Sequence, residues 1–232
     1  MKAKTSSSKV LPRFSLRLAP GLFVAALIAF CPLATRANTI ALSFTGTGLV
    51  GAGPDSTFGW AFTLHSPVLL TDLGVFDFPD RFPPGLNESH LVTVWTSTGI
   101  QVAQGTVPSG TSGTLVDNFR YSSIAPVSLA AGNYTIGAFY ISGSRDPVPF
   151  LATTVTTDAD VTYCGSRFGF GNAFPPGDHA NFPNSYFGPN FQFTAVSAPD
   201  SASTWTLMLL GLTATFGLQF LVPRLAQRSS NG

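Results

Sequence analysis

The chain has 232 residues, only 10% of them charged, and a formal net charge of +1. Its 23 Gly, 18 Pro and 21 Phe favour many short strands and turns over long helices. Between Asn38 and Asp200 four arginines and no lysine stand against eleven acidic residues, a net charge of −7. Such a segment offers no surface that neutralises phosphates, so nucleic acid is excluded as a partner.

The first 37 residues predict a secretory signal peptide. A basic, Ser-rich stretch over 1–17 precedes an apolar run from Leu18 to Leu33, and small residues surround Arg36. We expect signal peptidase to cleave after Ala37. Cys31 would leave with the leader, and Cys164 alone could form no internal disulfide, so stability must come from packing.

Residues 38–197 predict a single all-β domain. The clearest strand is Phe58–Leu64, in which large apolar residues alternate with small ones, placing the aromatics on one face. The other expected strands are Ile40–Phe44, Val68–Phe78, His90–Ser97, Ile100–Val107, Leu115–Ile124, Val127–Leu129, Tyr134–Ser142, Leu151–Thr157, Val161–Tyr163 and Asn190–Val196. About nine or ten short strands with close turn signals indicate an antiparallel β-sandwich, jelly-roll-like in form.

The C-terminal part of the chain predicts a membrane span. Residues 202–222 carry no charge, and about 20 residues of helix cross the roughly 30 Å of a bilayer's hydrocarbon core. We place the transmembrane helix at 203–222. Arg224 and Arg228 would stay cytoplasmic, which leaves the β-domain outside.

The order of features over 198–228 resembles the C-terminal sorting signal of exosortase substrates. Pro199-Asp200-Ser201, a short polar link, the apolar helix with Leu209–Leu212, and a terminal arginine resemble the PEP-CTERM group, especially its VPDSG variant. Ala198 and Ala202 depart from that variant. The resemblance implies that an exosortase-type membrane protease or transpeptidase removes the tail at Pro199-Asp200-Ser201, leaving the protein at a bacterial cell surface or in an exopolysaccharide matrix.

The domain itself is similar to a recurrent domain of unknown function in PEP-CTERM proteins. The resemblance covers most of residues 55–195, and its main segments are Phe58–Thr63, Leu73–Asp77, Phe119–Tyr121, Pro126–Tyr134 and Tyr186–Phe191. It implies no catalytic residues.

Catalysis is not expected, although a polysaccharide hydrolase remains an alternative. The three histidines match no metal-binding spacing, and surface or hydrogen-bonded positions are the expectation for them. Asp158 with Asp160, or Asp77 with Asp80, could form the carboxylate pair that glycoside hydrolysis needs. No catalytic residue is assigned.

Two binding sites are candidates. Oxygen ligands around one loop suit calcium, and Asp77, Asp80, Asn87 and Glu88 flank such a loop, although solvated acids explain the pattern equally well. Glycan contacts could come from a late aromatic and Asn-rich section, with the candidates Tyr186, Phe187, Asn181 and Asn184.

The sequence thus predicts an exported protein with a structural or adhesive role in an extracellular matrix. A carbohydrate-binding module, with or without calcium, is the alternative. Both would place exopolysaccharide beside the domain, and neither needs another cofactor.

Overall fold

The computed structural model describes residues 38–178 and 181–196, and in this part of the chain every regular element is a strand. The prediction of an all-β, antiparallel domain is confirmed. None of the residues described belongs to a helix that could cross a membrane. The predicted signal peptide, the sorting residues Pro199, Asp200 and Ser201, and the predicted helix 203–222 lie outside the described residues.

Two antiparallel sheets form the domain. The larger has the order β14-β13-β4-β10-β6-β7, with bounds Gly177–Asp178, Val161–Phe170, Ser56–Leu64, Gly132–Tyr140, His90–Thr96 and Gln101–Val107. The second has the order β1-β15-β5-β9-β8, with bounds Thr39–Ile40, Pro189–Ala195, Val68–Phe76, Phe119–Leu129 and Thr114–Val116. Two ribbons complete it: β2 (Leu42–Thr45) with β12 (Thr154–Thr157), and β3 (Gly48–Val50) with β11 (Val148–Phe150).

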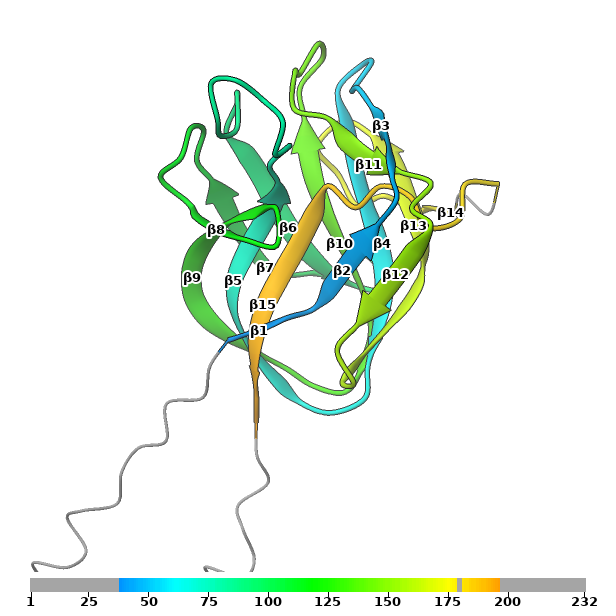
Figure 1. The fold of residues 1–232 in the computed structure, drawn as a ribbon. Helices are drawn as coiled ribbons and strands as arrows, with labels where there is room; N and C mark the ends of the chain where they lie inside the picture. The colour runs from blue at the N-terminus through cyan, green and yellow to red at the C-terminus, as the bar shows by residue number, and fades with distance from the viewer. Residues whose placement is uncertain (1–37, 179–180, 197–232) are drawn as a thin grey trace, which may run out of the picture. The chain divides into compact units, whose positions relative to one another are not determined.

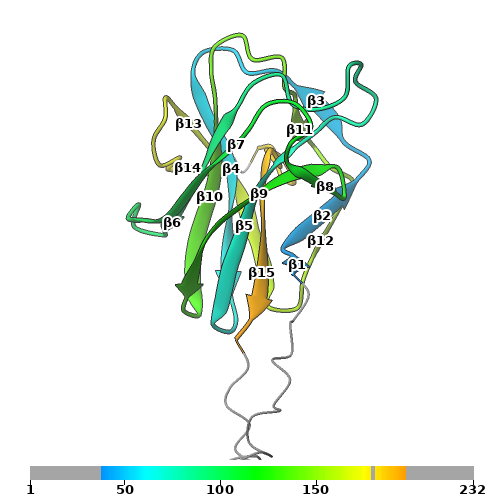
Figure 2. The same cartoon turned by 90° about the vertical axis from the view of Figure 1, so that its left-hand side faces the viewer.

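The two sheets lie face to face, and one side of the pair curls closed (Figures 1 and 2). Strand β7 of the six-stranded sheet packs against β9 of the other, while the ribbon β2–β12 borders the opposite side. The result is a sandwich-like arrangement with one curled half, which encloses a single main core.

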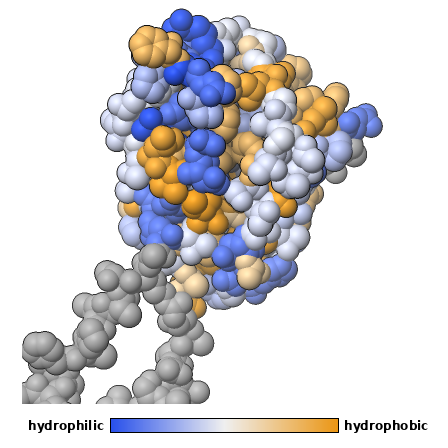
Figure 3. All heavy atoms as spheres, viewed as in Figure 1, coloured by the Kyte–Doolittle hydropathy of each residue, from blue (hydrophilic) through white to orange (hydrophobic). Residues whose placement is uncertain are grey.

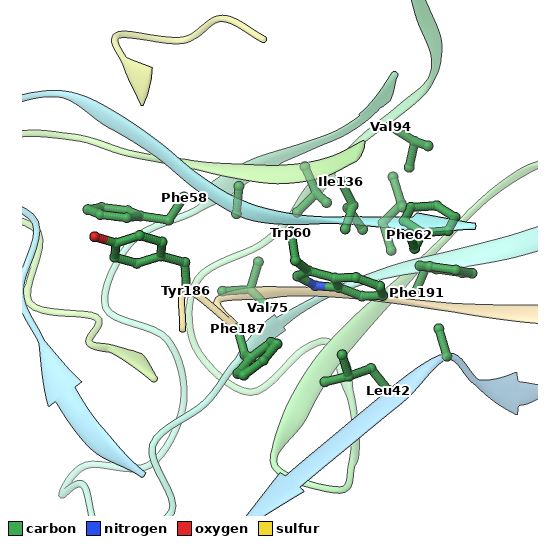
Figure 4. Close-up of a cluster of buried hydrophobic side chains, with 14 of the residues drawn as sticks. Leu42, Phe58, Trp60, Phe62, Val75, Val94, Ile136, Tyr186, Phe187 and Phe191 are labelled. Carbon is green, nitrogen blue, oxygen red and sulfur yellow. The ribbon is translucent and has the colours of Figure 1, made fainter. Parts of the chain in front are cut away.

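Alternation along β4 builds the centre of the core. Trp60 and Phe62 point between the sheets, whereas Gly59 and Ala61 lie on the outer face. Trp60 is fully buried, its indole Nε1 donates to the carbonyl of Pro189 at 2.9 Å, and its ring stacks on Phe191 with centroids 5.9 Å apart. Figure 4 shows these rings between side chains from both sheets. Fully burying each such side chain contributes about 1.5–3 kcal/mol.

The strand registers define two ends of the domain. Pairing of Thr39 with Phe193 and of Ala195 with Val68 brings the first and last described residues to one end, here called the proximal end (Figures 1 and 2). The opposite, distal end carries the loops 77–89, 108–113 and 141–147, which follow or precede the far ends of the strands.

The surface is mixed in character. The face shown in Figure 3 has apolar residues in small patches separated by hydrophilic ones. Ten acidic residues and four arginines fall within the described ranges, which gives a net charge of −6. Phe82, on the distal loop 77–89, is 94% exposed, the highest exposure among the large hydrophobic residues described.

Two expected elements are wrong in detail. The expected strand Leu115–Ile124 is divided by a tight turn at Asp117 and Asn118, whose φ angles are 49° and 61°, so β8 and β9 form a hairpin. Asp and Asn tolerate this left-handed conformation better than other side chains, which suits a two-residue hairpin turn. The expected strand Val161–Tyr163 is too short, because β13 continues to Phe170.

Candidate functional site

The most concentrated set of polar side chains in the described residues lies at the distal end, where loop 77–89 meets loop 141–147. Its centre is the carboxylate of Asp146, which is 1% exposed. The aromatic ring of Tyr140 at the end of β10 and the start of β6 at His90 form the apolar floor below it. We call this set, with Arg81, Asn87, Glu88, His90, Ser144 and Asp146 as members, the Asp146 clamp.

Backbone and side-chain donors from loop 77–89 surround the carboxylate. Oδ1 accepts from the Asn87 backbone N–H at 2.9 Å and from its side-chain amide at 3.0 Å. Oδ2 accepts from the Glu88 backbone N–H at 3.0 Å. The Arg81 guanidinium lies 3.0 Å from Oδ1. These contacts fix the base of a long loop that has no regular structure of its own.

His90 closes the clamp from the sheet side. Its Nε2 lies 2.9 Å from Asp146 Oδ2, and its Nδ1 lies 3.0 Å from the carbonyl oxygen of Phe139. Both neighbours are acceptors, so the ring satisfies both only when each nitrogen carries a hydrogen. The imidazole packs on the ring of Tyr140 at a centroid distance of 4.3 Å. His90 is therefore a buried structural histidine with both nitrogens engaged.

The donors hold Asp146 in its charged form. Burial alone would raise its pKa, but hydrogen bonds from His90 and from the backbone amides of Asn87 and Glu88 outweigh burial and lower the pKa to about 2. Burial next to the Asp146 charge has the opposite effect on the phenol of Tyr140, whose pKa is raised well above its usual range. The clamp therefore contains a permanent carboxylate at neutral pH.

One triplet in the clamp has the composition of a metal site. Ligand atoms of Glu88, His90 and Asp146 all lie within 4.8 Å of one another. An imidazole with two carboxylates suits a transition metal more than calcium. However, both Asp146 oxygens already accept hydrogen bonds, and the Arg81 cation contacts one of them. The donor set fits an internal ion-pair clamp better than a metal centre.

The structure separates the four residues predicted to hold calcium. Asn87 and Glu88 belong to the Asp146 clamp. Asp77 is buried and accepts from Arg120 Nε at 2.7 Å, whereas Asp80 is exposed. Among the described residues, the acidic cluster of Glu88 includes neither Asp77 nor Asp80. Calcium binding remains a prediction, and the four predicted ligands do not come together at one site in the described residues.

The four predicted glycan contacts differ in burial, and the prediction is wrong for the two aromatic residues. Tyr186 is 7% exposed and Phe187 is fully buried, because both rings fill the core between the sheets (Figure 4). Neither presents a face on which a sugar could stack. Asn184 is half-buried and its amide donates to the carbonyl of Ala152 at 3.4 Å, whereas Asn181 is exposed.

The predicted hydrolase carboxylates stabilise turns. Asp158 Oδ1 accepts from the backbone N–H of Asp160 at 2.9 Å, and Asp160 Oδ1 accepts from the Ser66 hydroxyl at 2.7 Å. The other candidate pair is broken up by the Asp77–Arg120 ion pair. The geometry gives neither pair an acid–base arrangement.

Sequence reasoning missed Asp146, the centre of the clamp. Ser144-Arg145-Asp146-Pro147 reads as an ordinary turn, and no spacing links it to His90, 56 positions earlier. The one available signal was the scarcity of charge, since an acid flanked by apolar strands in such a chain tends to have a buried partner. The sequence does not show that His90 and Arg81 are the partners of Asp146, because only the fold brings them together.

Comparison with protein-family models, with curated proteins and with solved structures finds no match for this chain.

Proposed function

We propose that the chain is an exported cell-surface or extracellular-matrix protein with a structural or adhesive role. In this proposal residues 1–37 are removed by signal peptidase, and the domain is first held at the membrane by a helix over 203–222. An exosortase-type enzyme then cleaves at Pro199-Asp200-Ser201. The support is the tripartite order of the tail and its resemblance to the PEP-CTERM sorting signal.

The observation that carries the proposal furthest is the pairing of Thr39 with Phe193. It brings residues 38 and 196 to the same end of the domain, so a tether at the C-terminal side would leave the distal end free (Figure 1). At that distal end the Asp146 clamp fixes loop 77–89 to loop 141–147. A rigid, outward-facing loop region suits a displayed domain, because binding then costs little loop ordering.

We infer a jelly-roll-like sandwich, since consecutive long strands pass repeatedly between the two sheets: β4 lies in one, β5 in the other, and β6 in the first again. Jelly rolls are frequent in surface and lectin domains, and the fold alone fixes no ligand.

Two alternatives from the sequence have unequal support. A hydrolase is disfavoured by the roles of Asp158 and Asp160 in a turn. Carbohydrate binding, by contrast, is supported by a surface groove whose lining includes neither Tyr186 nor Phe187.

The sorting step can be tested by fractionating native cells. Wild-type protein should be found in the matrix or outer-surface fraction, whereas Asp200→Ala should remain in the membrane fraction with its tail attached. The matched control is Asp80→Ala, an exposed acid on the domain. Identical fractionation of wild type and Asp200→Ala would contradict the proposal.

A further inference from the structure

The outer face of the six-stranded sheet carries a groove of about 270 Å³. None of the binding residues predicted above lines it. Its lining comes from β4, β10 and β13, from the turn after β6 and from the loop before β14. The lining residues are Ala61, Phe62, Ser97, Asn133, Tyr134, Thr135, Cys164, Arg167, Phe174 and Pro176. The size is just below the roughly 300–1,000 Å³ of sites for drug-sized ligands, so it suits one ring of a longer ligand.

Small residues in register form the floor. Across neighbouring strands Gly165 pairs with Ala61, Ala61 with Thr135, and Thr135 with Trp95. A β-bulge lies between Tyr163 and Gly165, where β13 has one extra residue, Cys164. These small residues leave a depression in the outer face of the sheet, between the larger side chains that border it.

The wall on one side is aromatic and is held in place. Phe174 packs edge-on against Trp95, with ring centroids 5.9 Å apart and an interplanar angle of 73°. A Cβ added to Gly99 would come within 3.3 Å of the Phe174 ring, so this glycine lets the ring lie close to the β6–β7 turn. Phe174 is therefore a positioned aromatic on the surface.

The floor contains a hydroxyl group. Thr135 is 3% exposed and lines the groove, so its hydroxyl lies where it could meet a hydroxyl of a ligand. Asn133 accepts from the Thr63 hydroxyl at 2.7 Å, which leaves its amide hydrogens available to a ligand.

We propose that this groove binds one neutral hexopyranose unit of a polysaccharide. The apolar face of the sugar ring would pack on Phe174, and its hydroxyls would meet Thr135 and Asn133. The net charge of −6 over the described residues opposes a polyanionic glycan, which selects a neutral sugar over a uronate. The domain could be displayed at the cell surface without binding a sugar, so a negative result for sugar binding would leave the proposed function standing.

Cys164 provides a built-in probe, because it is exposed and lines the groove. The full-length chain, in a detergent without a sugar headgroup, is alkylated with iodoacetamide in the presence of glucose, galactose or mannose hexamers. The expected result is saturable slowing of Cys164 alkylation by at least one of these neutral hexamers. Titration calorimetry with the same hexamer then gives the affinity.

Two variants assign the contact. Phe174→Ala and Thr135→Val should each weaken hexamer binding by about tenfold. Phe82→Ala, which removes an exposed aromatic at the distal end, should leave it unchanged. If Phe174→Ala does not fold, as judged by circular dichroism, the hexamer affinities of Thr135→Val and Asn133→Ala test the proposal instead. No protection by any neutral hexamer, protection by a hexuronate hexamer alone, or full affinity in these groove variants would overturn the proposal.

Discussion

The imidazole Nε2 of His90 lies 2.9 Å from Oδ2 of Asp146, and both side chains are 1% exposed. This contact joins the first residue of β6 to a loop that follows β10, two elements separated by 56 positions. It connects the wall of the core to the distal loops, so the strand framework directly determines where loop 77–89 lies.

Replacement of Asp146 by Asn should strongly destabilise the domain. The variant loses the charge that pairs with His90 and Arg81 and replaces one of the two acceptor oxygens by an NH2 donor, and breaking a buried pair in this way costs about 3–5 kcal/mol. Urea unfolding followed by tryptophan fluorescence measures the loss. Asp80→Asn, on the same side of the domain but exposed, should leave the midpoint unchanged. Equal midpoints for both variants would refute the role of the clamp.

Acid should remove this contribution of Asp146 in a defined range. Its pKa is lowered in the folded state from the ordinary value of 3.8 to about 2, so its stabilisation is complete above about pH 4 and declines as the pH falls toward 2. The groups facing it are Arg81, Glu88 and His90. The difference in urea midpoint between wild type and Asp146→Asn should therefore shrink from pH 5 to pH 2. A difference independent of pH would contradict this assignment.

Gly59 should tolerate no side chain. A Cβ built there would lie 1.9 Å from the carbonyl oxygen of Ile136 on the neighbouring strand β10, and backbone cannot yield as a flexible side chain would. We expect Gly59→Ala to lower the free energy of unfolding by about 1–3 kcal/mol. Gly51→Ala is the control, because its added Cβ would have no atom within 4 Å. Thermal unfolding that fails to separate the two variants would show that the sheet adapts.

The ion pair of Asp77 with Arg120 should be replaceable by apolar side chains. Both residues are buried, Asp77 Oδ1 has no partner within the described ranges, and the two charges had to be desolvated. Arg120→Met alone leaves a buried carboxylate and should cost about 3–5 kcal/mol, whereas Asp77→Leu with Arg120→Met should recover most of that loss. A double-mutant cycle by urea unfolding measures the coupling. A double variant as unstable as the single one would contradict the argument.

The strand framework was largely predictable, because alternation survives wherever one face of a sheet meets the core. Phe58–Leu64 coincides with most of β4, and the expected strands His90–Ser97 and Ile100–Val107 correspond to β6 and β7, which pair with each other. The turn at Asp117 and Asn118 was missed, since two polar residues inside a longer apolar pattern resemble a solvent-facing part of one strand.

The site was much less predictable. Burial of Tyr186 and Phe187 depends on how the chain before β15 enters between the sheets, and local composition suggested an exposed aromatic loop instead. The groove depends on cross-strand register, which aligns Gly165, Ala61 and Thr135 from distant segments. Sequence pattern specifies faces of strands but not which strands become neighbours.

The most direct test of surface sorting is the intact mass of the protein isolated from its native cells. We predict an N-terminus near Asn38 and a C-terminus close to Ser201. A mass that still includes Trp205 to Arg228 would contradict processing of the tail and would leave the chain as a protein with a permanent single-span anchor.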